Sequence, residues 1–163
     1  LFFDEVWEVK STDISYGHDI ESAWLLLKAT TELNEPALKE QIRVLAVKIA
    51  RAATEGIQQD GSMIYEKKPD GIDMDRHWWV QAEAVVGFMY SYELTDDKKY
   101  LNLASNLWTY IQSHLVDDVA GEWFWSVDHR GQPNRIDDKA GFWKCPYHNG
   151  RMCFEMINHF SFE

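Results

Sequence analysis

The stretch HWWVQAEAVVGFMYSY, at residues 77–92, is apolar on nearly every side of the helix that it predicts. A helix with this pattern is buried all round, whereas a surface helix carries one apolar stripe. Residues 98–114 have such a stripe and predict an amphipathic helix; its apolar positions are Leu101, Ala104, Leu107, Trp108 and Ile111. A buried helix followed by an amphipathic helix indicates a pair whose inner member needs further neighbours to cover it.

The same helix pair recurs along the chain. Residues 19–33 predict an inner helix, residues 37–56 an amphipathic one after a break at Asn34-Glu35-Pro36, and residues 148–160 a further inner helix. Between the pairs, residues 62–66 and 121–128 predict short strands of hairpins. Stacked pairs that close in a ring give an α/α barrel. The sequence therefore predicts an all-α fold, a portion of an (α/α)6 barrel with short β-hairpins in its loops.

The number of helix pairs is too small to close a ring of six. We therefore expect residues 1–163 to form a single, partial barrel domain, with the N-terminal half of the barrel absent from this chain. The edge that meets the absent helices is expected to be apolar. Exposed apolar patches seek cover, so self-association through that edge is expected.

The charge of the chain argues against several classes of partner. It carries 27 acidic and 16 basic residues, for a net charge of −11 at pH 7. Nucleic acids and anionic membranes both require clustered Lys and Arg. No apolar run approaches the roughly 20 residues of a membrane span, and the chain does not open with the pattern of a signal peptide. We expect a cytoplasmic protein with neither a nucleic acid nor a membrane as partner.

The cysteines give no sign of a metal site, and the many aromatic residues suggest a site for a sugar. Cys145 and Cys153 form no CxxC pair, so a zinc site is not predicted and no cofactor is expected. The chain has 8 Trp, 7 Tyr and 8 Phe, more than packing of a core requires. Trp in a concave site can stack on the C–H face of a sugar, although core packing is the alternative for any single Trp.

Two groups of polar and aromatic residues lie near the predicted starts of inner helices. His18 and Glu21 are three residues apart, so they share a helix face; acidic capping of the helix is the alternative for Glu21. Trp79 and Glu83 are four apart on the buried helix. A buried carboxylate is costly unless it is paired or faces a polar cavity, so Glu83 predicts either a site residue or a structural hydrogen bond.

A third group, GFWKCPYHNGR at residues 141–151, concentrates Trp143, Lys144, Tyr147, His148 and Arg151 at one helix start. Pro146 fixes the entry of the loop into that helix. The group predicts either a functional site or a well-capped helix under an aromatic lid.

Together, YGHDIE at residues 16–21, WWVQAE at 78–83 and GFWKCPYHN at 141–149 resemble the N-acylglucosamine 2-epimerase superfamily. They are most similar to the branch that acts on cellobiose. The resemblance covers nearly all of the chain, with the motifs in the same order. It implies an (α/α)6 barrel, of which this chain is the C-terminal portion, and a reaction that needs no metal.

The resemblance also implies roles for individual residues. His18 and His148 match the two histidines that act as acid/base catalysts. The residues that match the substrate cleft are Glu21, Trp78, Trp79, Glu83 and Trp143. The implied reaction inverts C2 of the reducing-end glucose of a β-1,4-linked disaccharide through a cis-enediol(ate). Imidazole suits both proton transfers because its pKa lies near neutrality.

Other functions remain open at this point. An N-acylglucosamine 2-epimerase or an aldose–ketose isomerase would use the same scaffold and histidines, the isomerase returning the proton to C1. A glycoside hydrolase would use two carboxylates, such as Glu21 and Glu83, and would leave the two histidines unexplained. A non-catalytic sugar-binding fragment is the last alternative.

Overall fold

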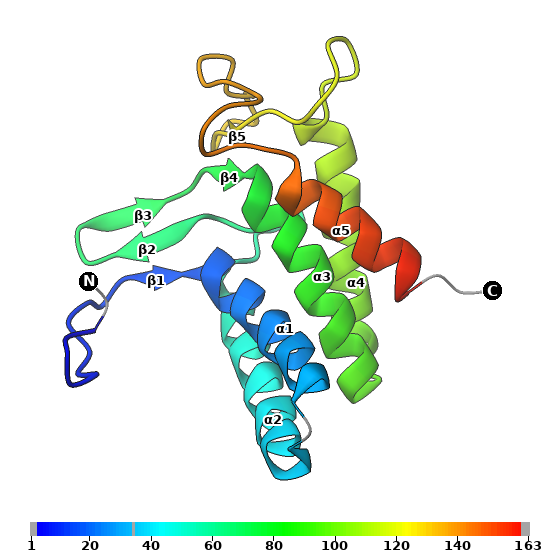
Figure 1. Ribbon diagram of the computed structural model, residues 1–163. Helices are drawn as coiled ribbons and strands as arrows, with labels where there is room; N and C mark the ends of the chain where they lie inside the picture. The colour runs from blue at the N-terminus through cyan, green and yellow to red at the C-terminus, as the bar shows by residue number, and fades with distance from the viewer. Residues whose placement is uncertain (1–2, 34, 161–163) are drawn as a thin grey trace.

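Five α-helices dominate residues 3–33 and 35–160, the part of the chain that the computed structural model describes (Figure 1). Their bounds are α1 (Tyr16–Glu32), α2 (Pro36–Ala53), α3 (Trp78–Thr95), α4 (Lys98–Tyr110) and α5 (Tyr147–Asn158). The five helices predicted from the sequence are confirmed within a few residues at each end. Pro36 occupies the first turn of α2, as predicted for the break before it, while Asn34 lies outside the described residues.

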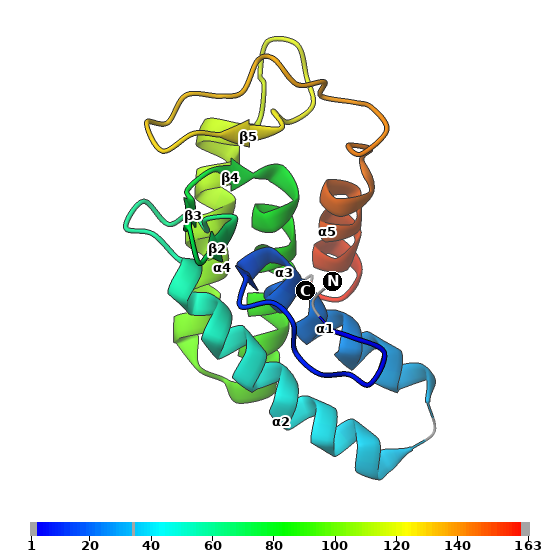
Figure 2. The ribbon, with the colours of Figure 1, turned by 90° about the vertical axis from the view of Figure 1, so that its left-hand side faces the viewer.

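The helices form an inner row and an outer pair. Figure 1 shows α1, α3 and α5 side by side, and Figure 2 shows α2 and α4 on the side of α1 and α3 away from α5. Helix α3 packs against α1, α2, α4 and α5, and every residue from Trp78 to Ser91 is buried. The prediction of a fully buried helix is confirmed, because neighbours cover α3 on all sides.

Two glycines let α1 and α3 approach closely. A Cβ atom at Gly87 would lie 2.5 Å from Cγ1 of Ile20, and one at Gly17 would lie 2.5 Å from Cη2 of Trp79. Only residues without a Cβ fit these positions. The contact at Gly17 allows the Trp79 ring to lie over the first turn of α1, next to His18.

Short strands surround the N-terminal ends of the inner helices (Figure 1). Antiparallel pairing gives one sheet in the order β1 (Ile14–Ser15), β2 (Glu66–Lys68) and β3 (Gly71–Asp73), and a second pairing joins β4 (Arg76–His77) to β5 (Ser126–Val127). Two sequence expectations were wrong in detail, since the strands expected at residues 62–66 and 121–128 are confined to Glu66 onward and to Ser126–Val127.

Local contacts explain both differences. The Gln81 side chain donates to the carbonyl of Met63 at 2.7 Å and accepts from its N–H at 2.9 Å, and the strand pairing at Met63 is limited to an isolated antiparallel bridge with Ile57. Glu122 has a φ of 61°, in the left-handed region, which interrupts an extended chain.

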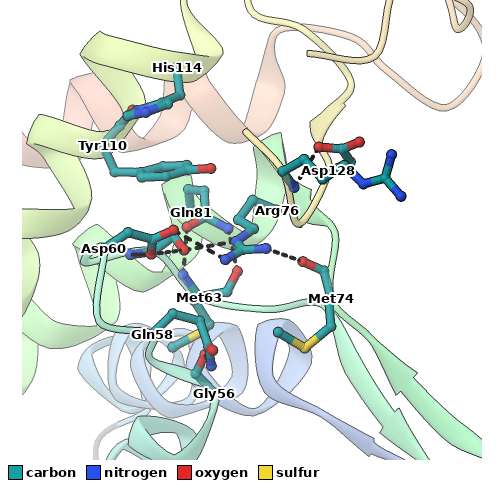
Figure 3. Close-up of polar contacts among 12 residues, drawn as sticks. Gly56, Gln58, Asp60, Met63, Met74, Arg76, Gln81, Tyr110, His114 and Asp128 are labelled. Atoms are coloured by element: carbon teal, nitrogen blue, oxygen red, sulfur yellow. Dashed lines mark hydrogen bonds and ion pairs between the residues drawn. The ribbon is translucent and has the colours of Figure 1, made fainter. Parts of the chain in front are cut away.

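Arg76 anchors β4 to the loop before β2 (Figure 3). Its buried guanidinium donates to Ser62 Oγ at 3.0 Å, to Asp60 Oδ2 at 3.1 Å and to the carbonyl of Met74 at 2.7 Å. Burial beside this network raises the pKa of Tyr110 to about 12. These contacts fix the backbone of the residue next to His77.

Helices α1 and α5 expose some of their apolar side chains. Leu25 and Leu26 on α1 are exposed, as are Phe154 and Ile157 on α5. Among the described residues, no helix combines the length and the apolar character that crossing a membrane would require.

Candidate active site

The N-terminal ends of α1, α3 and α5 meet at a pocket of about 390 Å³. This volume lies within the range of about 300–1,000 Å³ that is typical of small-molecule sites. The pocket is lined by His18, Glu21, Tyr65, His77, Trp78, Trp79, Trp125, Trp143, Tyr147 and His148. Six of the seven site residues expected from the sequence therefore line one pocket, and Glu83 lies directly beneath it.

His148 has a fixed hydrogen-bond partner. Its Nδ1 atom lies 2.6 Å from Oε1 of Glu83, and both side chains are buried. An ionised carboxylate only accepts hydrogen bonds, so Nδ1 carries the proton. In a neutral imidazole this arrangement leaves the lone pair on Nε2, where a general base requires it.

Glu83 is only 1% exposed, and its carboxylate has two further donors. Arg151 Nη2 donates to Oε1 at 2.6 Å, and Trp24 Nε1 donates to Oε2 at 2.9 Å. These contacts offset the cost of burying the charge. The position differs from the substrate contact expected for Glu83, because the carboxylate faces His148 and Arg151 and does not line the pocket.

Arg151 joins the two carboxylates of the site. Its Nη2 atom lies 2.8 Å from Oε1 of Glu21 as well as 2.6 Å from Glu83. Burial works against the charge, but the hydrogen bonds and charges of Glu83 and Glu21 outweigh it and raise the pKa of Arg151. The spacing of three residues from His148 puts Arg151 on the same helix face, in keeping with its place in the third group of the sequence.

His18 is held more loosely than His148. Its Nδ1 atom lies 2.7 Å from the Ser15 hydroxyl, which can donate or accept. Either tautomer of His18 can therefore be held in place. The His18 ring lies 4.9 Å from the Trp79 ring, and the His148 ring lies 5.6 Å from it, centre to centre. Trp79 thus contacts both imidazoles, which come from different inner helices.

Trp143 stands at the rim of the pocket on the loop before α5 and is 75% exposed. The next residue, Lys144, is almost completely buried and donates to Glu122 Oε1 and to the carbonyl of Lys139, both at 2.9 Å. Lys139 in turn bonds Asp117 at 2.6 Å. These contacts fix the loop that carries Trp143.

Sequence reasoning missed four residues that line the pocket: Tyr65, His77, Trp125 and Tyr147. Tyr65 and Trp125 lie in loops, where no helical spacing relates them to the other site residues. His77 appeared only as the first residue of the stretch that predicts the buried helix, and Tyr147 only as a member of the third group.

Carboxylates and histidines cluster in two places among the described residues. Glu21, Glu83 and His148 form one group and Asp73, Asp75 and His77 the other, with ligand atoms within 4.8 Å of one another in each. In the first group the guanidinium of Arg151 bonds both carboxylates. It therefore supplies the positive charge that a metal ion would otherwise bring.

The family profile and the curated relatives that match this chain indicate the same family. Residues 2–150 match the sequence profile of the N-acylglucosamine 2-epimerase (GlcNAc 2-epimerase) family. The chain is 52% identical over 159 residues to a cellobiose 2-epimerase from Bacteroides fragilis, covering 96% of this chain and 41% of that protein. The chain thus spans about two fifths of the length of this curated relative.

Comparison with solved structures indicates the same family. The crystal structure of a sugar epimerase from a ruminal bacterium superimposes with a TM-score of 0.92 at 38% identity, covering 99% of this chain and 42% of that chain. The cellobiose 2-epimerase from Bacillus thermoamylovorans superimposes with a TM-score of 0.83 at 42% identity, covering 95% of this chain and 40% of that chain. The five helices are therefore part of an (α/α)6 barrel.

Proposed function

Because the chain belongs to the N-acylglucosamine 2-epimerase family, we propose that it carries the C-terminal part of a carbohydrate 2-epimerase. The proposed substrate is a cellobiose-type β-1,4-disaccharide, inverted at C2 of its reducing-end glucose. The observation that carries the proposal is the pair of imidazoles, His18 and His148, which line one pocket from different helices and contact the same Trp79 ring.

The proposed reaction begins with the open-chain aldehyde, whose carbonyl makes the C2 proton acidic. Nε2 of His148 takes that proton, and the electron pair of the C–H bond forms the C1–C2 double bond of a cis-enediolate. His18 then returns a proton to C2 from the opposite face, which inverts the centre. A positioned acid or base typically contributes about 10²–10⁴ in rate.

The environments of the two histidines support these roles. Glu83 holds the proton of His148 on Nδ1 and stabilises the imidazolium that forms when Nε2 is protonated. The hydroxyl of Ser15 can bond either tautomer of His18. This suits a residue that donates a proton to C2 in the forward reaction and accepts one in the reverse reaction.

The remaining pocket residues suit an uncharged sugar. We assign Trp143, which is 75% exposed, to stacking on the sugar, with a contribution of about 1–3 kcal/mol by analogy with base stacking. The buried Trp78 and Trp79 form part of the wall of the pocket. Glu21 lines the pocket while bonded to Arg151, which leaves its second carboxylate oxygen available to accept from a sugar hydroxyl.

A hydrolytic function is less well supported. Retaining and inverting glycosidases need two carboxylates that flank the scissile bond. Glu83 is buried beneath the pocket, and a single guanidinium binds both it and Glu21. Neither arrangement suits a general acid or a nucleophile.

The test is conversion of cellobiose in deuterated water by the full-length protein that carries this sequence. The expected product is the mannose-type epimer with one deuterium at C2, because the returning proton comes from a group that exchanges with solvent. A ketose product would assign the site to an aldose–ketose isomerase, and release of glucose would assign it to a hydrolase. An epimer without deuterium would exclude the two-histidine mechanism.

We also propose that residues 1–163 form one partial barrel domain of a cytoplasmic protein. Cys145 and Cys153 are both exposed free thiols, which fits a reducing compartment. The exposed apolar side chains of α1 and α5 support the further proposal that these residues self-associate when they are isolated.

A further inference from the structure

We propose that Glu122 and Lys144 are positioning residues of the proposed epimerase, which hold Trp143 at a fixed distance from His148. This inference rests on the function proposed above, in which Trp143 stacks on the sugar and His148 takes the C2 proton. Neither Glu122 nor Lys144 is among the described residues that line the pocket, so both act through side chains that do.

One carboxylate oxygen of Glu122 binds both ends of the segment between these two pocket residues. Its Oε1 atom accepts from Nζ of Lys144 and from Nδ2 of Asn149, each at 2.9 Å. Lys144 directly follows Trp143, and Asn149 directly follows His148. A shared acceptor for these two neighbours therefore fixes the separation of the stacking ring from the imidazole.

The backbone holds Glu122 in place for these two contacts. Its φ of 61° lies in the left-handed region, which is uncommon for residues other than glycine and persists where the surroundings enforce it, often at functional sites. The hairpin before β5 enforces it here, since the carbonyl of Glu122 accepts from the N–H of Asp117 at 2.9 Å. Burial works to raise the pKa of the Glu122 carboxyl, but hydrogen bonds, the strongest from Lys144, outweigh burial and lower it. The carboxylate is therefore ionised at neutral pH.

Lys144 places its charge behind the wall of the pocket. Its side chain is 1% exposed, an uncommon position for lysine, and Nζ lies 5.3 Å from the centre of the Trp78 ring, within range of a cation–π contact. Trp78 lines the pocket, and its ring lies 6.2 Å from that of His148, centre to centre. The Lys144 ammonium thus joins the loop of Trp143 to the wall beside the proposed base.

Stability alone is a poor reason for this arrangement. A well-packed apolar side chain in place of a buried ion pair often leaves stability unchanged or raises it. The pair of Glu122 with Lys144 does give one defined geometry, because charged hydrogen bonds are short and directional. A positioning role predicts that loss of the pair acts on the reaction through Trp143, whereas a structural role predicts a loss that does not depend on Trp143.

The test is a double-mutant cycle in the full-length protein that carries this sequence. Lys144→Met should lower kcat/KM for cellobiose about tenfold, mainly by raising KM, which is within the roughly 5- to 150-fold that stacking on Trp143 could contribute. In a Trp143→Ala background the same substitution should lower kcat/KM by less than about twofold, because the ring that Lys144 positions is already gone. Lys98→Met, at an exposed lysine on α4, is the matched control and should have no effect in either background.

Two further measurements cover the case in which Lys144→Met fails to fold. Glu122→Gln keeps an oxygen that accepts from Lys144 and Asn149 but loses the charge, so a smaller loss with the same dependence on Trp143 is expected. Amide hydrogen exchange of residues 141–147 should become faster in both variants, while exchange in α3 should not change.

Other results would overturn the positioning role. Equal losses with and without Trp143 would show that the pair does not act through that ring, and unchanged hydrogen exchange at residues 141–147 would show that it does not hold the loop. A loss confined to kcat, at constant KM, would exclude an effect on sugar stacking, and an unchanged kcat/KM would exclude any part in the reaction. A wild-type protein that does not epimerise cellobiose would refute the proposed function itself, and the positioning role with it.

Discussion

Glu83 makes three hydrogen bonds with one carboxylate, to His148, Arg151 and Trp24. Its spacing of four residues from Trp79 predicted the helix face on which it lies. The sequence could not show that His148 and Arg151 would occupy the space above the carboxylate, since they come from a helix more than 60 residues further along. Of the two alternatives that the sequence left open for Glu83, the structural hydrogen bond fits its contacts better than a contact with the substrate.

Replacing Glu83 with Gln should lower kcat by about 10²–10⁴-fold, because the amide neither holds the Nδ1 proton as firmly nor stabilises the imidazolium. The free energy of unfolding should fall by about 3–5 kcal/mol, the cost of breaking a buried ion pair. Steady-state kinetics and urea unfolding measure the two effects. Glu155→Gln is the control, since Glu155 pairs with Lys28 and Tyr90 away from the pocket; it should affect stability alone.

Replacing either histidine should abolish inversion, but the two replacements should differ in their effect on the free energy of unfolding. His18→Ala and His148→Ala are each expected to abolish epimerisation, because inversion at C2 needs a base and an acid. His18 is exposed, so its loss should change the free energy of unfolding by less than about 0.5 kcal/mol. Loss of the buried His148 should cost about 1–3 kcal/mol, because it removes a donor from Glu83.

Assay of the epimer and urea unfolding on the same preparations test this pair of predictions. Residual inversion in either variant would contradict the assignment. Equal stability of the two variants would contradict the difference in burial. Both histidines line the pocket, but His18 is exposed whereas His148 is buried against Glu83.

The loop between β5 and α5 shows what helical spacing cannot reveal. Periodicity predicted the five helices because buried faces repeat every three to four residues. Nothing in the spacing of Asp117 and Lys139, or of Glu122 and Lys144, indicates that they pair across the loop. The position of Trp143 therefore follows from tertiary contacts of two lysines.

The pairing of Asp117 with Lys139 makes a prediction about pH. The hydrogen bond from Lys139, together with those from the backbone N–H groups of Ala120 and Val119, lowers the pKa of Asp117 to about 2. Because the native pKa is below the unfolded value of about 3.9, the pair stabilises the fold above pH 4. That contribution should disappear as the pH falls toward 2.

Thermal unfolding of wild type and Asp117→Asn across this pH range tests the prediction. The difference in Tm should be largest between pH 5 and 7 and should shrink between pH 4 and 2. Asp118→Asn is the matched control, because Asp118 is an exposed neighbour that should give no such dependence. A constant difference in Tm for Asp117→Asn would show that the pair does not contribute through its charge.

At the scale of the whole molecule, the inner helices differ in how completely their apolar side chains are buried. Those of α3 are covered by neighbouring helices, whereas Phe154 and Ile157 on α5 remain exposed. They are three residues apart and share one face of the helix. The incomplete ring predicted an apolar edge. Which side chains of α5 are exposed depends on the orientation of this helix about its axis, which the contacts of His148 and Arg151 with Glu83 set.

Residues 1–163 expressed alone should associate reversibly through this face, because paired apolar side chains on one helix gain more from mutual burial than isolated ones. Sedimentation velocity over a range of concentrations should show an average mass above that of a monomer. Replacing Phe154 and Ile157 together with Ser should shift the protein toward the monomer at every concentration. Val119→Ser, at an isolated exposed apolar residue in a loop, should not. Association that survives the double substitution would show that another surface is responsible, and a monomer at all concentrations would mean that the exposed face of α5 is too small to hold two copies together.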